Sequence, residues 1–387
     1  MENSFDNLFI SSPNDGGLFF IYNNRVVKLD SIDTTGLTIT PRVILRGVQP
    51  GSLYFLNNCG AQCKNVTRNI NDIHDVLIHD GHCYIVDTSR NSIVKFNSDG
   101  EEVKSFTYSG AEDAKHINCL AVWNGRVFFS AFGDFTKSRG YKDHSSCTGF
   151  VQDLLTGKQL IKGLSQPHSL TILKDNLVLA NSEEKEIREY SPDGTLLRVK
   201  KLNGYTRGIS VVGDRMYVGL SSSRNIASSG IEHATLVALD ADSWEFRGDI
   251  SLPVKEIYSV ISIGNDRDAI NSLMSIASHS NFLMRQAVSE RDNQIAALIS
   301  QFLSDQEVPG PILANQQIPP EPESFLHLYT ELQQAKTTIT AMRKTLSWRL
   351  TKPLRVVRRM ISYQKQRRLV VEEFADESWK EQPVSLR

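Results

Sequence analysis

Polar side chains that could do chemistry recur at one position of a repeated β-rich pattern. His74, Asn118, His168 and Arg207 each stand seven residues before a Gly or Asp that begins a turn, and Tyr258 falls near the same place in a later strand. A second polar set lies two residues earlier and consists of His116, Gln166 and Tyr205. The shared spacing predicts that these side chains meet.

Three kinds of chemistry fit this set. Two histidines could hold a metal ion, but no carboxylate occupies the aligned position, although Asp72 and Asp75 lie close by in the sequence, and we expect no metal. General acid–base catalysis of lyase or hydrolase type would use His74 and His168, with Arg207 holding an anionic substrate. Otherwise the set binds a sugar, phosphate or carboxylate group. The structural alternative is hydrogen bonding between neighbouring repeats.

The motifs of familiar enzyme classes are missing from the sequence. It contains no Gly-rich phosphate loop, no Gly-x-Ser-x-Gly elbow and no pair of cysteine motifs with zinc-ligand spacing. The pattern therefore predicts no cofactor and leaves open whether the protein is an enzyme.

The elements that must position these side chains are repeated hairpins. A turn residue followed by an alternating apolar run occurs six times, at Gly17, Gly51, Gly81, Gly125, Asp175 and Asp214. Most of these runs follow another apolar strand, and a third and often a fourth strand come after them. Four antiparallel strands at this spacing are typical of a propeller blade. We predict an all-β, six-bladed β-propeller over residues 1–264, with five blades possible because the second repeat is short.

One further strand, within residues 257–264, has no hairpin partner behind it. We expect it to pair with the N-terminal strand LFISS and close the ring, which would remove the exposed edges. In a propeller the first strand of each blade lines the central channel. The aligned polar residues should therefore converge on one mouth of the channel and form a pocket.

The remainder of the chain predicts an α-helical, partly coiled-coil tail. Its expected parts are a helical segment at 265–306, a Pro-rich linker at 307–322, a helix at 323–371 and an acidic disordered tail at 372–387. Apolar residues recur at three- and four-residue steps in the second helix, which is compatible with a coiled coil or a partner helix.

A strongly basic segment lies within that second helix. Between Ala341 and Arg368 there are ten Lys or Arg and no Asp or Glu. Its expected membrane or partner contacts are Trp348, Arg349, Lys352, Arg355, Arg358 and Arg359. A basic amphipathic helix with a Trp suits an anionic membrane surface. A protein partner is the alternative, and we expect no nucleic acid because no recognition motif is present.

No long apolar run and no signal peptide is visible, so a cytoplasmic location is expected.

The repeat region resembles a known family. The stretch from Gly163 to Arg224, with its Gln-Pro-His-Ser motif, is similar to an uncharacterised bacterial propeller family, and the likeness extends over roughly residues 5–264. It adds Ser169 and Arg224 to the candidate ligand-binding residues. Leu170 departs from the family, where Pro is common. The resemblance implies the propeller fold and no established activity.

The tail has a resemblance of its own. The phrases ERDNQIAAL and SWRLTKPLR look like tails of bacterial glycosyltransferases and methyltransferases of O-antigen and capsule assembly. This implies a peripheral protein at the inner face of the cytoplasmic membrane, with a glycosyltransferase or other assembly protein as partner. We therefore expect an accessory protein that binds a saccharide or sugar-phosphate group at the channel mouth. The alternatives are a His/Arg enzyme and a protein–protein scaffold.

Overall fold

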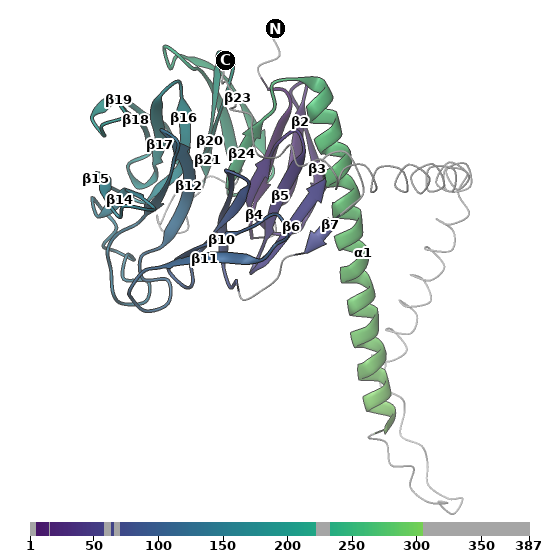
Figure 1. Cartoon of the computed structure of the whole chain (residues 1–387). Coiled ribbons are helices and arrows are strands. Elements are labelled where there is room, and N and C mark those ends of the chain that lie inside the picture. The colour runs from purple at the N-terminus through teal and green to yellow at the C-terminus, as the bar shows by residue number, and fades with distance from the viewer. Residues whose placement is uncertain (1–4, 15, 58–62, 66–69, 222–232, 305–387) are drawn as a thin grey trace, which may run out of the picture. The chain divides into compact units, whose positions relative to one another are not determined.

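The computed structural model describes residues 5–14, 16–57, 63–65, 70–221 and 233–304. These residues contain six four-stranded antiparallel sheets, followed by one long helix (Figure 1). The prediction of a six-bladed β-propeller is confirmed, and the five-bladed alternative is wrong.

The first sheet combines both ends of the repeat region. Its order, from the channel outward, is β24 (Ser259–Ser262), β1 (Leu8–Ser12), β2 (Gly17–Tyr22) and β3 (Arg25–Asp30). The second is β4 (Thr34–Ile39), β5 (Val43–Val48), β6 (Ser52–Asn57) and β7 (Cys63–Asn65). The third is β8 (Ile73–His79), β9 (His82–Asp87), β10 (Ser92–Phe96) and β11 (Glu102–Thr107).

The last three sheets follow chain order in the same way. The fourth is β12 (Ile117–Trp123), β13 (Arg126–Ala131), β14 (Gly149–Asp153) and β15 (Gln159–Leu164). The fifth is β16 (Pro167–Leu173), β17 (Asn176–Asn181), β18 (Glu186–Tyr190) and β19 (Leu196–Lys201). The sixth is β20 (Tyr205–Val212), β21 (Arg215–Ser221), β22 (Ala234–Asp240) and β23 (Phe246–Leu252).

The hydrophobic core lies between the blades. Each of six buried clusters joins two neighbouring sheets, so that the clusters form a closed ring. Strands inside a blade can therefore be buried on both faces, as β12 and β13 are over most of their length, whereas outer strands such as β11 and β19 are mostly exposed. This burial explains the nearly continuous apolar runs of strands such as β2, β13 and β17.

The ring is closed by pairing between distant parts of the chain. Strand β24 pairs antiparallel with β1, from Leu8 opposite Ser262 to Ser11 opposite Ser259. The closing strand predicted within residues 257–264 is confirmed. The innermost strand of every blade is therefore paired with the second strand of that blade.

Two of the six turn residues used to find the repeat mark a different strand from the other four. Gly81, Gly125, Asp175 and Asp214 precede the second strand of their blades, but Gly17 and Gly51 precede the third. The blade number was right, but the alignment of the first two repeats was one strand out of phase.

Helix α1 (Asp266–Ser304) packs against the first two blades (Figure 1). Ala269, Ile276 and Leu283 are buried in the cluster that joins these blades. The Ser280 hydroxyl accepts a hydrogen bond of 3.1 Å from Nη1 of the fully buried Arg46 of β5. In the described part of the chain, no helix combines the length and apolarity needed to cross a membrane. The linker, the second helix with its coiled-coil seam and basic segment, and the acidic tail all lie outside the described residues.

Candidate functional site

The inner strands share an irregularity close to one end of the channel. Five of them, β4, β8, β12, β16 and β20, shift register against their second strand near the same place. A bulge of this kind bends a strand and redirects a side chain. The repeated bulge explains why polar side chains at one sequence position face a common space.

Two rings of side chains follow from this geometry. The bulge position carries Thr35, His74, Asn118, His168, Arg207 and Tyr258, one from each blade. The position two residues earlier carries Asp33, Asp72, His116, Gln166, Tyr205 and Glu256. The sequence pattern did not indicate Asp33, Thr35 or Glu256, because the first two repeats were out of phase and the position two residues earlier was aligned in only three repeats. Asp72 was indicated only as a carboxylate close to His74 in the sequence.

Most of both rings lines one cavity of about 630 Å³. Its wall contains Asp33, Thr35, Asp72, His74, His116, His168, Tyr205, Arg207, Glu256 and Tyr258, with further residues from neighbouring loops. The predicted convergence of His74, His168 and Arg207 on one opening is therefore observed. Of the candidate ring residues, Asn118 and Gln166 do not line this cavity.

The surroundings of His168 keep its imidazole neutral, so that the ring can act as a base or as a hydrogen-bond acceptor. Its Nδ1 lies 2.9 Å from the Gln166 carbonyl and 2.8 Å from Ser182 Oγ, and the Ser182 hydroxyl itself donates to the Thr206 carbonyl. Since these oxygens accept, Nδ1 carries the proton and Nε2 has a lone pair. Burial, with Arg207 and two other histidines nearby, lowers the pKa of His168 well below its usual value.

His116 has the same protonation pattern. Its Nδ1 lies 2.8 Å from Asp113 Oδ1, and burial lowers its pKa despite that carboxylate. His74, from the next blade, has its ring centroid 4.9 Å from that of His116, and its Nδ1 is 3.2 Å from Asp72 Oδ1 without hydrogen-bond geometry. Two His–Asp pairs from neighbouring blades therefore face each other.

Both carboxylates of these pairs are ionised. Burial acts to raise the pKa of Asp72, but His74 and Gln49 outweigh it and the pKa is lowered. The pKa of Asp113 is lowered in the same way, because the effects of His116 and Tyr141 outweigh the effect of burial. Neither group can donate a proton at neutral pH.

The arginine of the ring is already partnered. Arg207 forms an ion pair with Glu256, and its guanidinium carbon lies 3.7 Å from the centre of the Tyr258 ring. Tyr258 is 6% exposed, and its hydroxyl has no hydrogen-bond partner within the part of the chain that the structure describes. A buried hydroxyl in a cavity wall normally bonds a ligand or a water.

A long connection between β13 and β14 completes the cavity. Arg139, Tyr141 and Lys142 from this connection line it. Tyr141 donates to Asp113 Oδ2 at 2.7 Å, and Arg139 Nε lies 3.2 Å from the same oxygen. Sequence reasoning missed these residues, although a 17-residue connection in a repeat with short turns is itself a signal of function.

Side chains just after the bulge join neighbouring blades. Asp75 Oδ2 accepts from the Leu120 amide at 2.7 Å, Cys119 Sγ from the Ser169 amide at 3.1 Å, and Ser169 Oγ from the Gly208 amide at 2.7 Å. A bulge leaves a backbone N–H outside the ladder, and the preceding blade supplies its acceptor. Ser169, expected to bind ligand, is thus engaged between blades.

The other candidates have different surroundings. Gln166 is buried, accepts from the Tyr205 hydroxyl at 2.6 Å and donates to Ser145, so it supports the wall. Asn118 is fully buried; its Oδ1 lies 3.1 Å from Cys119 Sγ, and its Nδ2 has no partner within the described residues. Arg224 and the six basic-segment candidates lie outside the described residues. No group of His, Cys, Asp or Glu that the structure describes is placed to hold a metal ion.

Six four-stranded blades with a polar cavity at one end of the channel define the chain as a β-propeller with a candidate binding site. Residues 57–266 match the family DUF4915, a domain of unknown function, and the chain belongs to this family. No curated protein matches it.

Solved structures show the same fold at low sequence identity. A protein of unknown function from Bacteroides caccae is 12% identical at a TM-score of 0.50, over 66% of this chain and 97% of that chain. A chain in a structure of a nidogen/laminin complex is 11% identical at a TM-score of 0.50, over 66% of this chain and 97% of its own. These similarities establish the fold alone.

Proposed function

We propose that this propeller binds a saccharide in the cavity at its channel mouth, as an accessory protein of surface-polysaccharide assembly. The observation that carries the proposal is the buried Tyr258 hydroxyl, which has no partner among the described residues and lies beside an arginine that is paired with Glu256. Aromatic rings next to paired charged groups suit a ligand with both C–H faces and hydroxyls. The lone pairs on Nε2 of His116 and His168 add acceptors for such hydroxyls.

The charge of the wall favours a neutral saccharide over a sugar phosphate. The lining has four carboxylates, Asp33, Asp72, Asp113 and Glu256, and three cations, Arg139, Lys142 and Arg207. With histidines counted as neutral, 3 minus 4 gives a net charge of −1. To hold a phosphate, Arg207 would have to give up or share its ion pair with the largely buried Glu256.

Replacing Tyr258 by Phe tests the site directly. We expect neutral saccharides that raise the melting temperature of the wild type to bind the Tyr258→Phe protein about three- to tenfold more weakly, since one hydrogen bond is lost. Folding stability should not fall, because the hydroxyl has no partner in the described chain. The measurement is calorimetric titration of neutral mono- and disaccharides beside their phosphates.

Ser169→Ala is the matched control for this experiment. It removes the acceptor of the Gly208 amide and should lower stability while leaving saccharide affinity unchanged. Binding of phosphates but of no neutral saccharide would show that the proposed ligand class is wrong.

Acid–base catalysis is a second candidate, supported by the Asp113–His116 pair. A carboxylate that fixes a histidine tautomer and leaves Nε2 free is an arrangement used by general bases. Hydrolysis by an Asp72 and Asp113 pair is disfavoured, because glycosidases need one protonated carboxyl and the pKa of each is lowered here. Loss of turnover in His116→Gln with retained binding would support catalysis.

The tail supports the assembly context through its sequence alone. We propose that its basic segment holds the protein at an anionic membrane surface and that its helices contact a glycosyltransferase or other assembly protein. Replacing Arg355, Arg358 and Arg359 by Glu should abolish co-sedimentation with phosphatidylglycerol vesicles, because juxtamembrane cations contribute about 1 kcal/mol each. Replacing them by Lys is the control. Unchanged co-sedimentation of the Glu variant would contradict surface binding.

A further inference from the structure

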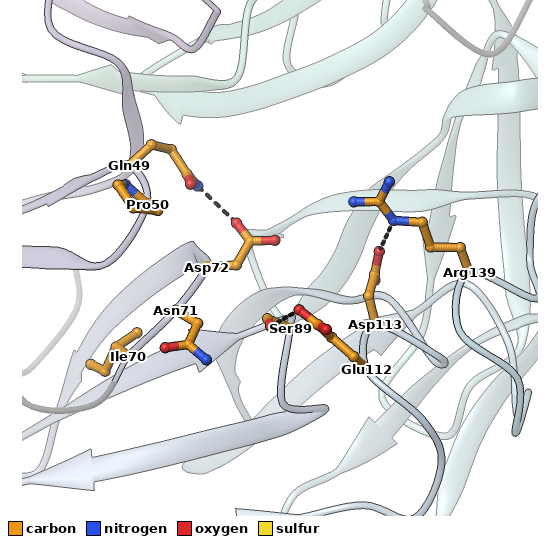
Figure 2. A pocket seen from close by; sticks show the side chains of 9 residues that line it. All are labelled: Gln49, Pro50, Ile70, Asn71, Asp72, Ser89, Glu112, Asp113 and Arg139. Atoms are coloured by element: carbon orange, nitrogen blue, oxygen red, sulfur yellow. Dashed lines mark hydrogen bonds and ion pairs between the residues drawn. The ribbon is translucent and has the colours of Figure 1, made fainter.

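A second cavity of about 600 Å³ shares lining residues with the first. Figure 2 shows the side chains that line the second cavity. Four of its residues, Gln49, Asp72, Asp113 and Arg139, also line the cavity at the channel mouth. The others are Pro50, Ile70, Asn71, Ser89 and Glu112. Shared walls make the two cavities parts of one groove, with an inner part at the channel mouth and an outer part over the second and third blades.

The outer part differs from the inner part in charge. It contains three carboxylates, Asp72, Glu112 and Asp113, and one cation, Arg139. One minus three gives a net charge of −2; Asp72, Asp113 and Arg139 also line the inner part, so the charge that the outer part adds is that of Glu112. An anionic group would be repelled here, whereas a cation or a hydroxyl donor would be stabilised.

The carboxylates differ in how far they are already engaged. Asp113 uses both oxygens, for His116, Arg139 and Tyr141. Glu112 accepts from Ser89 through Oε1 at 2.7 Å, and Asp72 accepts from Gln49 through Oδ1 at 3.0 Å (Figure 2). Hydrogen bonds within the described chain reach neither Glu112 Oε2 nor Asp72 Oδ2. These two oxygens remain as acceptors for a ligand.

A metal ion does not fit these acceptors. No metal-holding set of His, Cys, Asp or Glu exists among the described residues, and a compact divalent ion needs several oxygens at once. An ammonium group has three donors on a point charge and can use two spaced carboxylates with water between.

We propose that the groove binds a saccharide of at least two units, with an amino sugar carrying a free ammonium group in the outer part. This rests on the proposed function, which places a saccharide at the channel mouth. The inner unit bonds Tyr258 and the histidines, and the outer unit reaches Glu112 and Asp72. The buried hydroxyl of Tyr258 lies in the wall of the inner part, which shares four residues with the outer part.

Glucosamine, its β-1,4-linked dimer and the N,N′-diacetylated dimer are matched probes. The dimers share a backbone and differ in charge when the amines are protonated at pH 6. We expect calorimetric titration of the full chain to give at least tenfold tighter binding of the free-amine dimer than of glucosamine or of the acetylated dimer. Raising the salt concentration should reduce this preference.

Glu112→Gln tests the contribution of the outer part of the groove to binding without changing the inner part. This variant should lose three- to tenfold in affinity for the free-amine dimer and nothing for the N,N′-diacetylated dimer, which has no ammonium group. Glu102→Gln, on the exposed strand β11, is the matched control and should change neither.

The other possible binding results distinguish failure of the amino-sugar assignment from failure of the proposed function. A dimer that binds no tighter than glucosamine would show that the groove has a single subsite, with saccharide binding intact. Equal affinity for the two dimers would exclude recognition of the ammonium. Absence of binding by all three probes, with neutral saccharides still bound at the channel mouth, would overturn the amino-sugar assignment. If the neutral saccharides also fail to bind, both the amino-sugar assignment and the proposed function are wrong.

Discussion

Replacing Arg46 by Met is expected to destabilise the protein by about 3–5 kcal/mol, which is the cost of leaving one partner of a buried ion pair alone. Arg46 and Asp30 are both 0% exposed in their side chains, and Arg46 Nη1 lies 2.9 Å from Asp30 Oδ2. Thr34 and Ser280 complete the network. Without the guanidinium, the buried Asp30 carboxylate loses its ion-pair partner and keeps the Ser280 hydroxyl and the Ile32 amide as donors.

The measurement is urea unfolding followed by circular dichroism. Arg247→Met is the control, because Arg247 is 50% exposed where it pairs with Asp240 and should contribute under about 1 kcal/mol. The double variant Arg46→Met with Asp30→Asn should recover much of the loss, since it removes the unpaired charge. Equal losses for Arg46→Met and Arg247→Met would contradict the role of burial.

Stability is expected to fall by about 2–4 kcal/mol as the pH rises from 4 to 7, through Asp75 alone. Burial raises the pKa of Asp75 from 3.8 to about 7, although its carboxylate accepts from the Leu120 and Val76 amides. Between these two values the folded protein keeps the proton and the unfolded chain has lost it. Raising the pH through this window therefore favours unfolding, and above about pH 7 the effect is constant.

Asp75→Ser isolates this contribution. Serine occupies the equivalent position at Ser169, where its hydroxyl accepts a backbone amide from the next blade, so the substitution keeps an acceptor and removes the charge. The free energy of unfolding of the variant, measured at several pH values, should be flatter than that of the wild type between pH 4 and 7. Identical pH profiles would show that Asp75 titrates normally.

The blades could be predicted from the sequence because each inner hairpin repeats one turn position. Gly81, Gly125, Asp175 and Asp214 mark equivalent strands and bring their preceding polar residues to one register. The first two blades could not be phased in this way. The innermost strand of the first blade comes from the other end of the propeller, so Gly17 marks a third strand.

The sequence predicted the residues at the bulge position of the candidate site, but it did not predict how the charged groups around them pair. Asp72, Asp113 and Glu256 lie outside the strands, in connections without a hydrophobic period, and their partners are set by tertiary contacts. Hence the sequence pointed to an arginine available for an anion. The folded chain gives Arg207 a carboxylate partner instead.

Closure of the first blade has a consequence for biosynthesis. The Ser259 amide bonds the Ser11 hydroxyl, 248 residues earlier in the chain, so β1 leaves the ribosome long before its inner neighbour β24 has been translated. The nascent propeller must hold an open edge until synthesis of the repeat region ends. Helix α1 follows β24 directly and packs across the same blade, so the ring is sealed and the helix docks only after these two late segments have left the ribosome.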